Sequence, residues 1–260
     1  MILLFLLAAQ AVPASGPVAG PPAPTEERFD RCVDLATSDP RAAEDEAGRW
    51  QRDGGGFLAH QCLGITYANQ TRWTAGAAEF EAAARGAEVA RDRRAATYWA
   101  QAGNAWLAGG DASKALGALN AALAAGTLEG VQRGEANLDR ARALVAGGKL
   151  AAARIDLDRA LVDAAADPLA WLLSATLARR MDELPRAKKD IAEAIRLAGD
   201  DASVQLEAGN IAALAGDEAG AKTAWNAAVR LRPESDAARN ARNALRQFDA
   251  PATPSVPTKP

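Results

Sequence analysis

The sequence contains few aromatic residues, few β-branched residues and a single histidine, His60. Aromatic side chains make up only 5% of the 260 residues, whereas alanine and leucine supply most of the 49% that is hydrophobic. Because β-branched and aromatic residues favour strands while alanine and leucine favour helices, this composition argues against a β-rich fold. The chain is therefore predicted to be all-α.

The scarcity of histidine and cysteine also limits the chemistry that the chain can perform. With one histidine and two cysteines, no zinc site of ordinary ligand spacing can be assembled. Gly147-Gly148-Lys149 lacks the upstream glycine and the following Ser or Thr of a phosphate-binding loop. We therefore predict a protein that is not an enzyme and uses no cofactor, and we interpret His60 as a packed side chain.

Neither sign of charge dominates the sequence, and the formal net charge is -3. Binding to nucleic acid requires a basic face that neutralises phosphates, so nucleic acid is not predicted as a partner. Charged residues that lie close together on one predicted helix are interpreted as a solvated, salt-bridged face rather than as an acid–base pair. They are Glu135, Asp139, Arg140 and Arg142.

The longest hydrophobic run lies at the N-terminus, MILLFLLAAQAVPAS, although no Lys or Arg precedes it. Its roughly twelve apolar positions are too few to span a bilayer core of about 30 Å but suit a signal peptide. We predict a signal peptide over residues 1–14, a Pro-rich disordered linker over residues 15–25, and no integral membrane span after cleavage. The predicted location is the periplasm of a Gram-negative bacterium. The alternative is a hydrophobic N-terminus without a role in export.

The two cysteines, Cys32 and Cys62, lie in the first and third predicted helices. In an oxidising compartment they can form a disulfide bond if their Cα atoms lie within about 7 Å. The alternative is that each is a free thiol packed as a small apolar side chain. The sequence leaves both interpretations open.

A repeated pattern of paired helices occupies residues 57–233. Its clearest example is Gly103–Leu123, in which two short helical faces are joined by a Gly-Gly-Asp turn. A small residue midway along the first helix is followed by two alanines on the second helix, with a large residue between them. The units begin near Phe57, Ala96, Gly134, Pro168 and Ala202, and the last three starts are 34 residues apart. Because one such unit cannot bury its apolar face alone, successive units are predicted to stack.

This pattern resembles the tetratricopeptide repeat family over about Phe57 to Pro233. The resemblance implies an α-solenoid of stacked antiparallel helix pairs, wound as a right-handed superhelix of about 13 helices. Before the five repeats, residues 26–56 are predicted to form a degenerate helical pair. After them, residues 234–248 are predicted to form a capping helix and residues 249–260 a disordered tail.

In this family the first helices of successive pairs line a concave surface that binds extended or helical peptide segments. Carried over to this chain, the register implies a lining of Gln61, Asn104, Leu107, Leu138, Arg142, Leu172, Leu173, Thr176, Arg179, Arg180 and Asn210. An amide can pair with both the NH and the C=O of a peptide, so Asn104 and Asn210 are candidates for backbone binding. Leucines edged by arginines suit a partner with hydrophobic anchors and acidic residues, unless the leucines are core and the arginines merely solvated.

Some members of the family bind a C-terminal carboxylate with a clamp of Lys, Arg and Asn residues. The cationic positions of such a clamp hold only non-basic residues in this chain, for example Gln61, Leu138 and Leu173. We therefore predict a non-catalytic interaction scaffold that binds a peptide or partner protein in its concave groove by other contacts. The alternative is a self-associating structural module without a peptide ligand.

Overall fold

The computed structural model describes residues 24–249, and within them thirteen helices and no strand occur. The predicted signal peptide lies outside the described residues, as does the predicted tail beyond Asp249. The helices are α1 (Pro24–Ser38), α2 (Pro40–Arg52), α3 (Gly56–Asn69), α4 (Trp73–Val89), α5 (Ala95–Ala108), α6 (Ala112–Ala124), α7 (Gly130–Ala146), α8 (Leu150–Asp163), α9 (Pro168–Arg180), α10 (Leu184–Ala198), α11 (Ala202–Leu214), α12 (Glu218–Leu231) and α13 (Asp236–Asp249).

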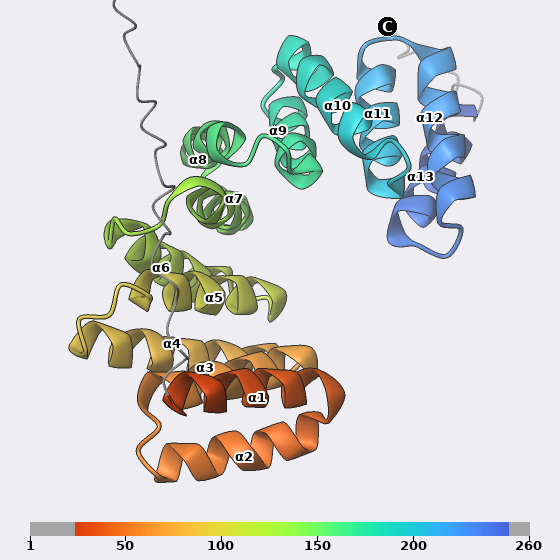
Figure 1. Ribbon diagram of the computed structural model, residues 1–260. Coiled ribbons are helices and arrows are strands. Elements are labelled where there is room, and N and C mark those ends of the chain that lie inside the picture. The colour runs from red at the N-terminus through yellow and green to blue at the C-terminus, as the bar shows by residue number, and fades with distance from the viewer. Residues whose placement is uncertain (1–23, 250–260) are drawn as a thin grey trace, which may run out of the picture.

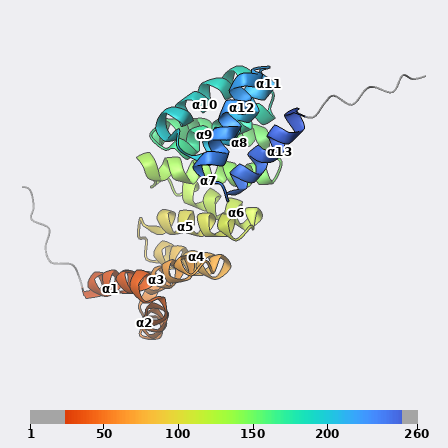
Figure 2. The same cartoon turned by 90° about the vertical axis from the view of Figure 1, so that its right-hand side faces the viewer.

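The helices follow one another along a single stack, which starts at α1 and α2 and bends before it ends at α11–α13 (Figure 1). Each helix packs against the next one in the sequence, and first helices of neighbouring pairs also meet, as α5 does with α7 and α9 with α11. The turned view shows the same succession, with α2 at one end of the stack and α11 at the other (Figure 2). The prediction of an all-α solenoid built from helix pairs is confirmed.

Aspartate starts many of these helices because its side chain accepts hydrogen bonds from free backbone NH groups of the first turn. Asp111 accepts from the NH of Lys114, and Asp217 accepts in the same way from Gly220. Within residues 24–249 no helix has both the length and the hydrophobicity that crossing a membrane requires.

A small residue on the first helix of each repeat faces a large one on the second. A Cβ atom added to Gly64 would lie 2.7 Å from Cδ1 of Phe80, and one added to Gly103 would overlap the side chain of Leu119. These glycines therefore allow the two helices to approach closely. Ala115, on the facing helix of the second unit, is fully buried, as the repeat pattern predicts.

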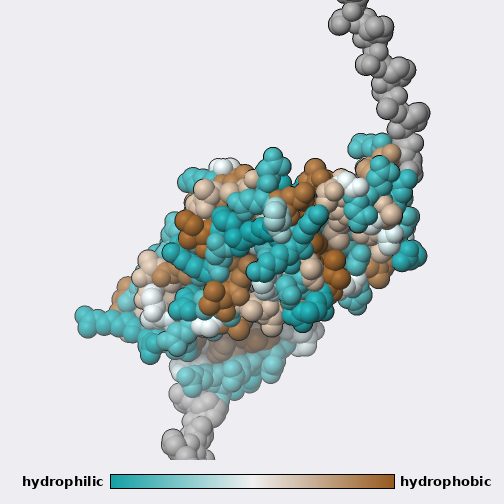
Figure 3. Space-filling view, turned by 90° about the horizontal axis from the view of Figure 1, so that it is seen from above, coloured by the Kyte–Doolittle hydropathy of each residue, from teal (hydrophilic) through white to brown (hydrophobic). Residues whose placement is uncertain are grey.

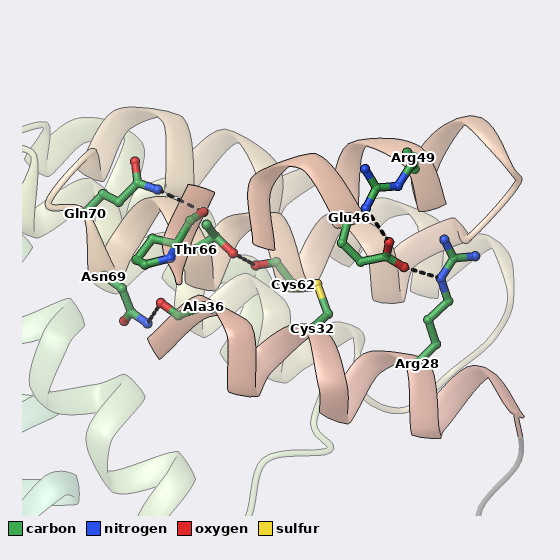
Figure 4. The surroundings of a disulfide bond; sticks show 10 residues. Arg28, Cys32, Ala36, Glu46, Arg49, Cys62, Thr66, Asn69 and Gln70 are labelled. Atoms are coloured by element: carbon green, nitrogen blue, oxygen red, sulfur yellow. Dashed lines mark hydrogen bonds and ion pairs between the residues drawn. A yellow bond between two sulfur atoms is a disulfide. The ribbon is translucent and has the colours of Figure 1, made fainter. Parts of the chain in front are cut away.

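At the N-terminal end, a disulfide bond joins Cys32 of α1 to Cys62 of α3 (Figure 4). The two Cα atoms are 6.1 Å apart, and both side chains are fully buried. Nearby, the side-chain amide of Asn69 donates a hydrogen bond to the carbonyl of Ala36 at 3.0 Å. Helix α1 begins at Pro24, two residues before the predicted boundary, because proline is well suited to the first turn of a helix.

At the C-terminal end, α13 covers the last helix pair. Ala237 and Ala241 are buried there, and the ring of Phe248 packs edge-on against Trp225 with centroids 5.5 Å apart. Viewed from above, the surface shows apolar residues in separate small areas among hydrophilic ones (Figure 3). The face seen from above therefore presents a mixed surface rather than one broad apolar area.

Candidate peptide-binding groove

A hollow of about 520 Å³, here called the large hollow, opens along α5, α7 and the start of α9. Phe80, Leu128 and Leu138 form an apolar floor, since all three are buried and line the hollow. Polar side chains stand around this floor, among them the amides of Gln101 and Gln132. First helices of successive pairs therefore enclose one continuous recess.

A second hollow of about 150 Å³, here called the small hollow, lies between α7, α8 and α9. Its apolar lining consists of Ala141, Val145, Leu157, Leu173 and Leu177, and its polar lining of Arg142, Thr176 and Arg180. Arg142 lines both hollows, so the two are adjacent on the face of the first helices.

The structure brings together about half of the residues predicted to line the groove. The residues that line one or both hollows are Asn104, Leu138, Arg142, Leu173, Thr176 and Arg180. The residues that line neither are Gln61, Leu107, Leu172, Arg179 and Asn210. Leu107 and Leu172 pack against clusters of buried residues instead, because the helix pairs draw them into the core.

Arg179 and Asn210 are both engaged by a buried carboxylate. Arg179 Nε donates to Oε1 of Glu207 at 2.6 Å, and Asn210 Nδ2 donates to Oε2 of the same residue at 3.2 Å. The Glu207 side chain is only 8% exposed, and burial of a polar group is costly unless its oxygens have hydrogen-bond partners such as these. Trp225 Nε1 also donates to Oδ1 of Asn210 at 3.1 Å. Both of these predicted groove residues are therefore hydrogen-bonded within the protein.

A similar arrangement surrounds Asp139 on α7. Asn104 Nδ2 donates to Oδ2 of Asp139 at 2.8 Å, and a terminal guanidinium nitrogen of Arg142 donates to Oδ1 at 2.8 Å. Asp139 and Glu207 occupy the same position of their repeats, because two periods of 34 residues separate them. The role of these acids as holders of groove side chains was not predicted. The available signal is the i, i+3 spacing to Arg142 and Asn210.

His60 lies outside both hollows and is partly buried against the neighbouring helices. Its Nδ1 lies 2.7 Å from Oε2 of Glu79 and 3.0 Å from Nε2 of Gln51, and its side chain is 37% exposed. It bridges neighbouring helices through hydrogen bonds. Within residues 24–249, no group of three or more His, Cys, Asp or Glu side chains is arranged to hold a metal ion.

No protein-family model and no curated protein matches this sequence. Solved structures do match it. PilF of Pseudomonas aeruginosa has a TM-score of 0.68 and 17% identity, covering 86% of this chain and 99% of that chain. PilW, a widely conserved type IV pilus biogenesis factor, has a TM-score of 0.68 and 18% identity, covering 85% and 98%.

YrrB, a tetratricopeptide repeat protein with an unusual peptide-binding site, has a TM-score of 0.57 and 18% identity, covering 76% of this chain and 96% of that chain. Identities of this size show a shared fold and leave partners and pathways open. The 34-residue spacing of the last three unit starts, the close small-to-large contacts within units and these structural matches agree. The chain therefore has the tetratricopeptide repeat fold, as its sequence pattern predicted.

Proposed function

We propose that this protein is a non-catalytic interaction scaffold that holds an extended segment of a partner protein along the face of its first helices. The observation that carries this proposal is the large hollow, in which an apolar floor is surrounded by hydrogen-bonding side chains from successive repeats. Protein interfaces combine an apolar centre with a polar rim in the same way. YrrB, which shares the fold, is described as having a peptide-binding site, and this supports the same use here.

Site-specific photo-crosslinking in the native host tests the proposal. A benzophenone amino acid is placed either at Gln132, which is exposed and lines the large hollow, or at Arg230, which is exposed on α12 and lines neither hollow. We expect an adduct with a partner from position 132 alone, and a marked loss of that adduct when Arg142→Glu is added. Equal adducts from both positions, or an adduct that Arg142→Glu leaves unchanged, would reject this face as the binding site.

We also propose that the protein is exported to the periplasm. The hydrophobic N-terminal run supports this, and so does the buried bond between Cys32 and Cys62, because disulfides persist in oxidising compartments. Intact mass after alkylation in denaturant, measured with and without prior reduction, tests the bond in protein taken from cells, because both sulfur atoms are buried in the folded chain. We expect two thiols to react only after reduction, together with a mature N-terminus near residue 14. Two thiols that react in the unreduced, denatured protein would contradict export.

A further inference from the structure

We propose that the small hollow binds one phenylalanine- or leucine-sized side chain of the partner segment, and that Arg180 and Arg142 select a segment with an acidic residue beside that side chain. The inference rests on the proposed function, because it specifies which segment the face of the first helices binds.

The size and chemistry of the small hollow favour an apolar side chain. Its volume of about 150 Å³ is close to that of a protein cavity known to hold one benzene molecule. The only uncharged polar side chain in the lining is Thr176, whose hydroxyl already donates to the carbonyl of Leu172 at 2.9 Å. A polar side chain placed there would lose hydrogen bonds to water without gaining replacements.

The charges at the small hollow favour an acidic neighbour. Arg142 is paired with Asp139, whereas Arg180 is exposed and makes no hydrogen bond or ion pair with any residue of the described range 24–249. The preceding residue of α9 shows the contrast, since Arg179 forms an ion pair with Glu207. Two arginines and one aspartate leave an excess of one positive charge at this site. A carboxylate in the partner would gain charge-assisted hydrogen bonds from Arg180, and a lysine would be repelled.

The position of the small hollow indicates an internal segment of a partner rather than a chain end. Because Arg142 lines both hollows, a segment bound in the small hollow can extend across α7 towards the large hollow. Neither terminal segment of this chain carries the required pair. Residues 1–23 contain no acidic residue, and residues 250–260 contain neither an acidic residue nor a phenylalanine or leucine.

Selection from a random peptide library tests this inference with the full mature chain as bait. The peptides are displayed at the N-terminus of a phage coat protein, so their own C-termini carry no free carboxylate. We expect enrichment of Phe or Leu followed or preceded closely by Asp or Glu. In an enriched peptide, replacing the acid by its amide should weaken binding about tenfold, as expected for one lost charge-assisted contact.

Three variants sharpen the selection. Arg180→Glu should change the preference beside the apolar residue from acidic to basic, whereas the matched Arg230→Glu on α12 should leave it acidic. Val145→Phe, which fills the small hollow, should remove the preference for Phe or Leu, and Leu173→Trp offers a second filling variant if the first does not fold. Helical circular dichroism of each variant establishes that it is folded.

The outcomes separate this inference from the scaffold proposal. Enriched peptides without an apolar–acidic pair, or an acidic preference that survives Arg180→Glu, overturn the inference and leave the scaffold proposal standing. A selection that enriches nothing also overturns the inference. It counts against the scaffold proposal only if photo-crosslinking at Gln132 gives no adduct either.

Discussion

The third and fourth of the five repeats, α7–α8 and α9–α10, are here called the middle repeats, and they hold their helices together differently from α5–α6 and α11–α12 on either side of them. One pair of facing positions shows this, because the repeat register makes it equivalent in all four units. The pair is Ala102 and Ala118 in α5–α6, Arg140 and Asp156 in α7–α8, Ser174 and Asp190 in α9–α10, and Ala208 and Ala224 in α11–α12.

In the middle repeats the acid of each pair is buried and hydrogen-bonded, and Arg140 is partly buried. Arg140 donates from Nε and from a terminal nitrogen to the two carboxylate oxygens of Asp156, each at 2.7 Å, and the Asp156 side chain is only 3% exposed. The hydroxyl of Ser174 donates to Asp190 and accepts from Arg154 at 2.7 Å. Burial, aided by the neighbouring Arg186, lowers the pKa of the Arg154 guanidinium from its usual range.

One fold therefore accommodates two kinds of interhelical contact, and these differ in how strongly a single substitution changes the stability of the protein. A buried ion pair stabilises a protein little more than a well-packed apolar pair does. Removal of one partner, however, is strongly destabilising, because it leaves the other charge buried and unpaired. Substitution of one residue of an alanine pair leaves no buried charge unpaired. We therefore expect the middle repeats, which also carry the small hollow, to respond most strongly to single substitutions and to recover when both partners change together.

The largest effect is expected from breaking the ion pair of α7–α8. Arg140→Ala leaves Asp156 buried with only Arg159 near it, at 3.4 Å, and should lower the free energy of unfolding by about 3 kcal/mol. Adding Asp156→Ala recreates the alanine pair of α5–α6 and should restore most of that loss. Urea unfolding followed by circular dichroism measures both variants. A double variant no more stable than the single one would show that the two kinds of contact are not interchangeable.

A smaller effect is expected in α9–α10. Ser174→Ala removes the hydroxyl that links Arg154 to Asp190. Each of these two buried charged groups then loses one hydrogen bond. The free energy of unfolding should fall by about 2 kcal/mol. The control is Ala208→Ser at the equivalent position of α11, where no buried charge awaits a partner. If both substitutions change stability equally, the charge network is not what makes this position sensitive.

The flanking repeats should instead be sensitive to added volume. Gly103→Ala places a methyl group against Leu119, which costs about 2 kcal/mol in overpacking and returns about 1 kcal/mol of helix propensity. The net loss of about 1 kcal/mol should appear in urea unfolding. Repeat α7–α8 already carries Ala141 at this position opposite Leu157, so Ala141→Gly there should lose helix propensity together with the packing of a buried methyl group. A stabilised Gly103→Ala would show that close approach is not required in α5–α6.

The smallest effect is expected from a charge pair on the surface of repeat α7–α8. Two hydrogen bonds of 2.7 Å from Arg133 hold the pKa of Asp163 below its usual range. A carboxylate with a lowered pKa in the folded state stabilises the protein above its unfolded pKa, and this contribution is lost as the pH falls through the folded pKa. NMR titration should show the pKa of Asp163 rising towards its usual range in Arg133→Gln. An unchanged pKa would mean that the pair does not persist in solution.

The repeat framework could be predicted from sequence because it depends on side-chain size at fixed spacing. Small and large residues alternate at facing positions of each unit. In α5–α6 these residues are Gly103, Leu119 and Ala122, and the structure packs them together. The capping helix could be predicted for the same reason, since its alanines follow one face.

The groove could be predicted only in part. The repeat register determines on which face of its helix a side chain lies, but it does not determine which neighbouring residue that side chain contacts. Arg179 and Arg180 are adjacent in sequence, yet only Arg179 reaches Glu207, 28 residues further on. Arg140 was interpreted as part of a solvated face, but it extends to Asp156 on the next helix. Long flexible side chains require the three-dimensional placement of both helices before their partners can be assigned.

The bond between Cys32 and Cys62 makes the two ends of the stack differ in their resistance to unfolding. A structure whose units touch only their neighbours behaves like a zipper, which opens from a free end. The bond fastens the first helix to the third, so that α1 cannot peel away while α3 is in place. The opposite end is held by noncovalent contacts, such as that between Phe248 and Trp225. Under tension or protease attack we therefore expect the zipper to open from α13 towards α1, and to open from both ends once the bond is reduced.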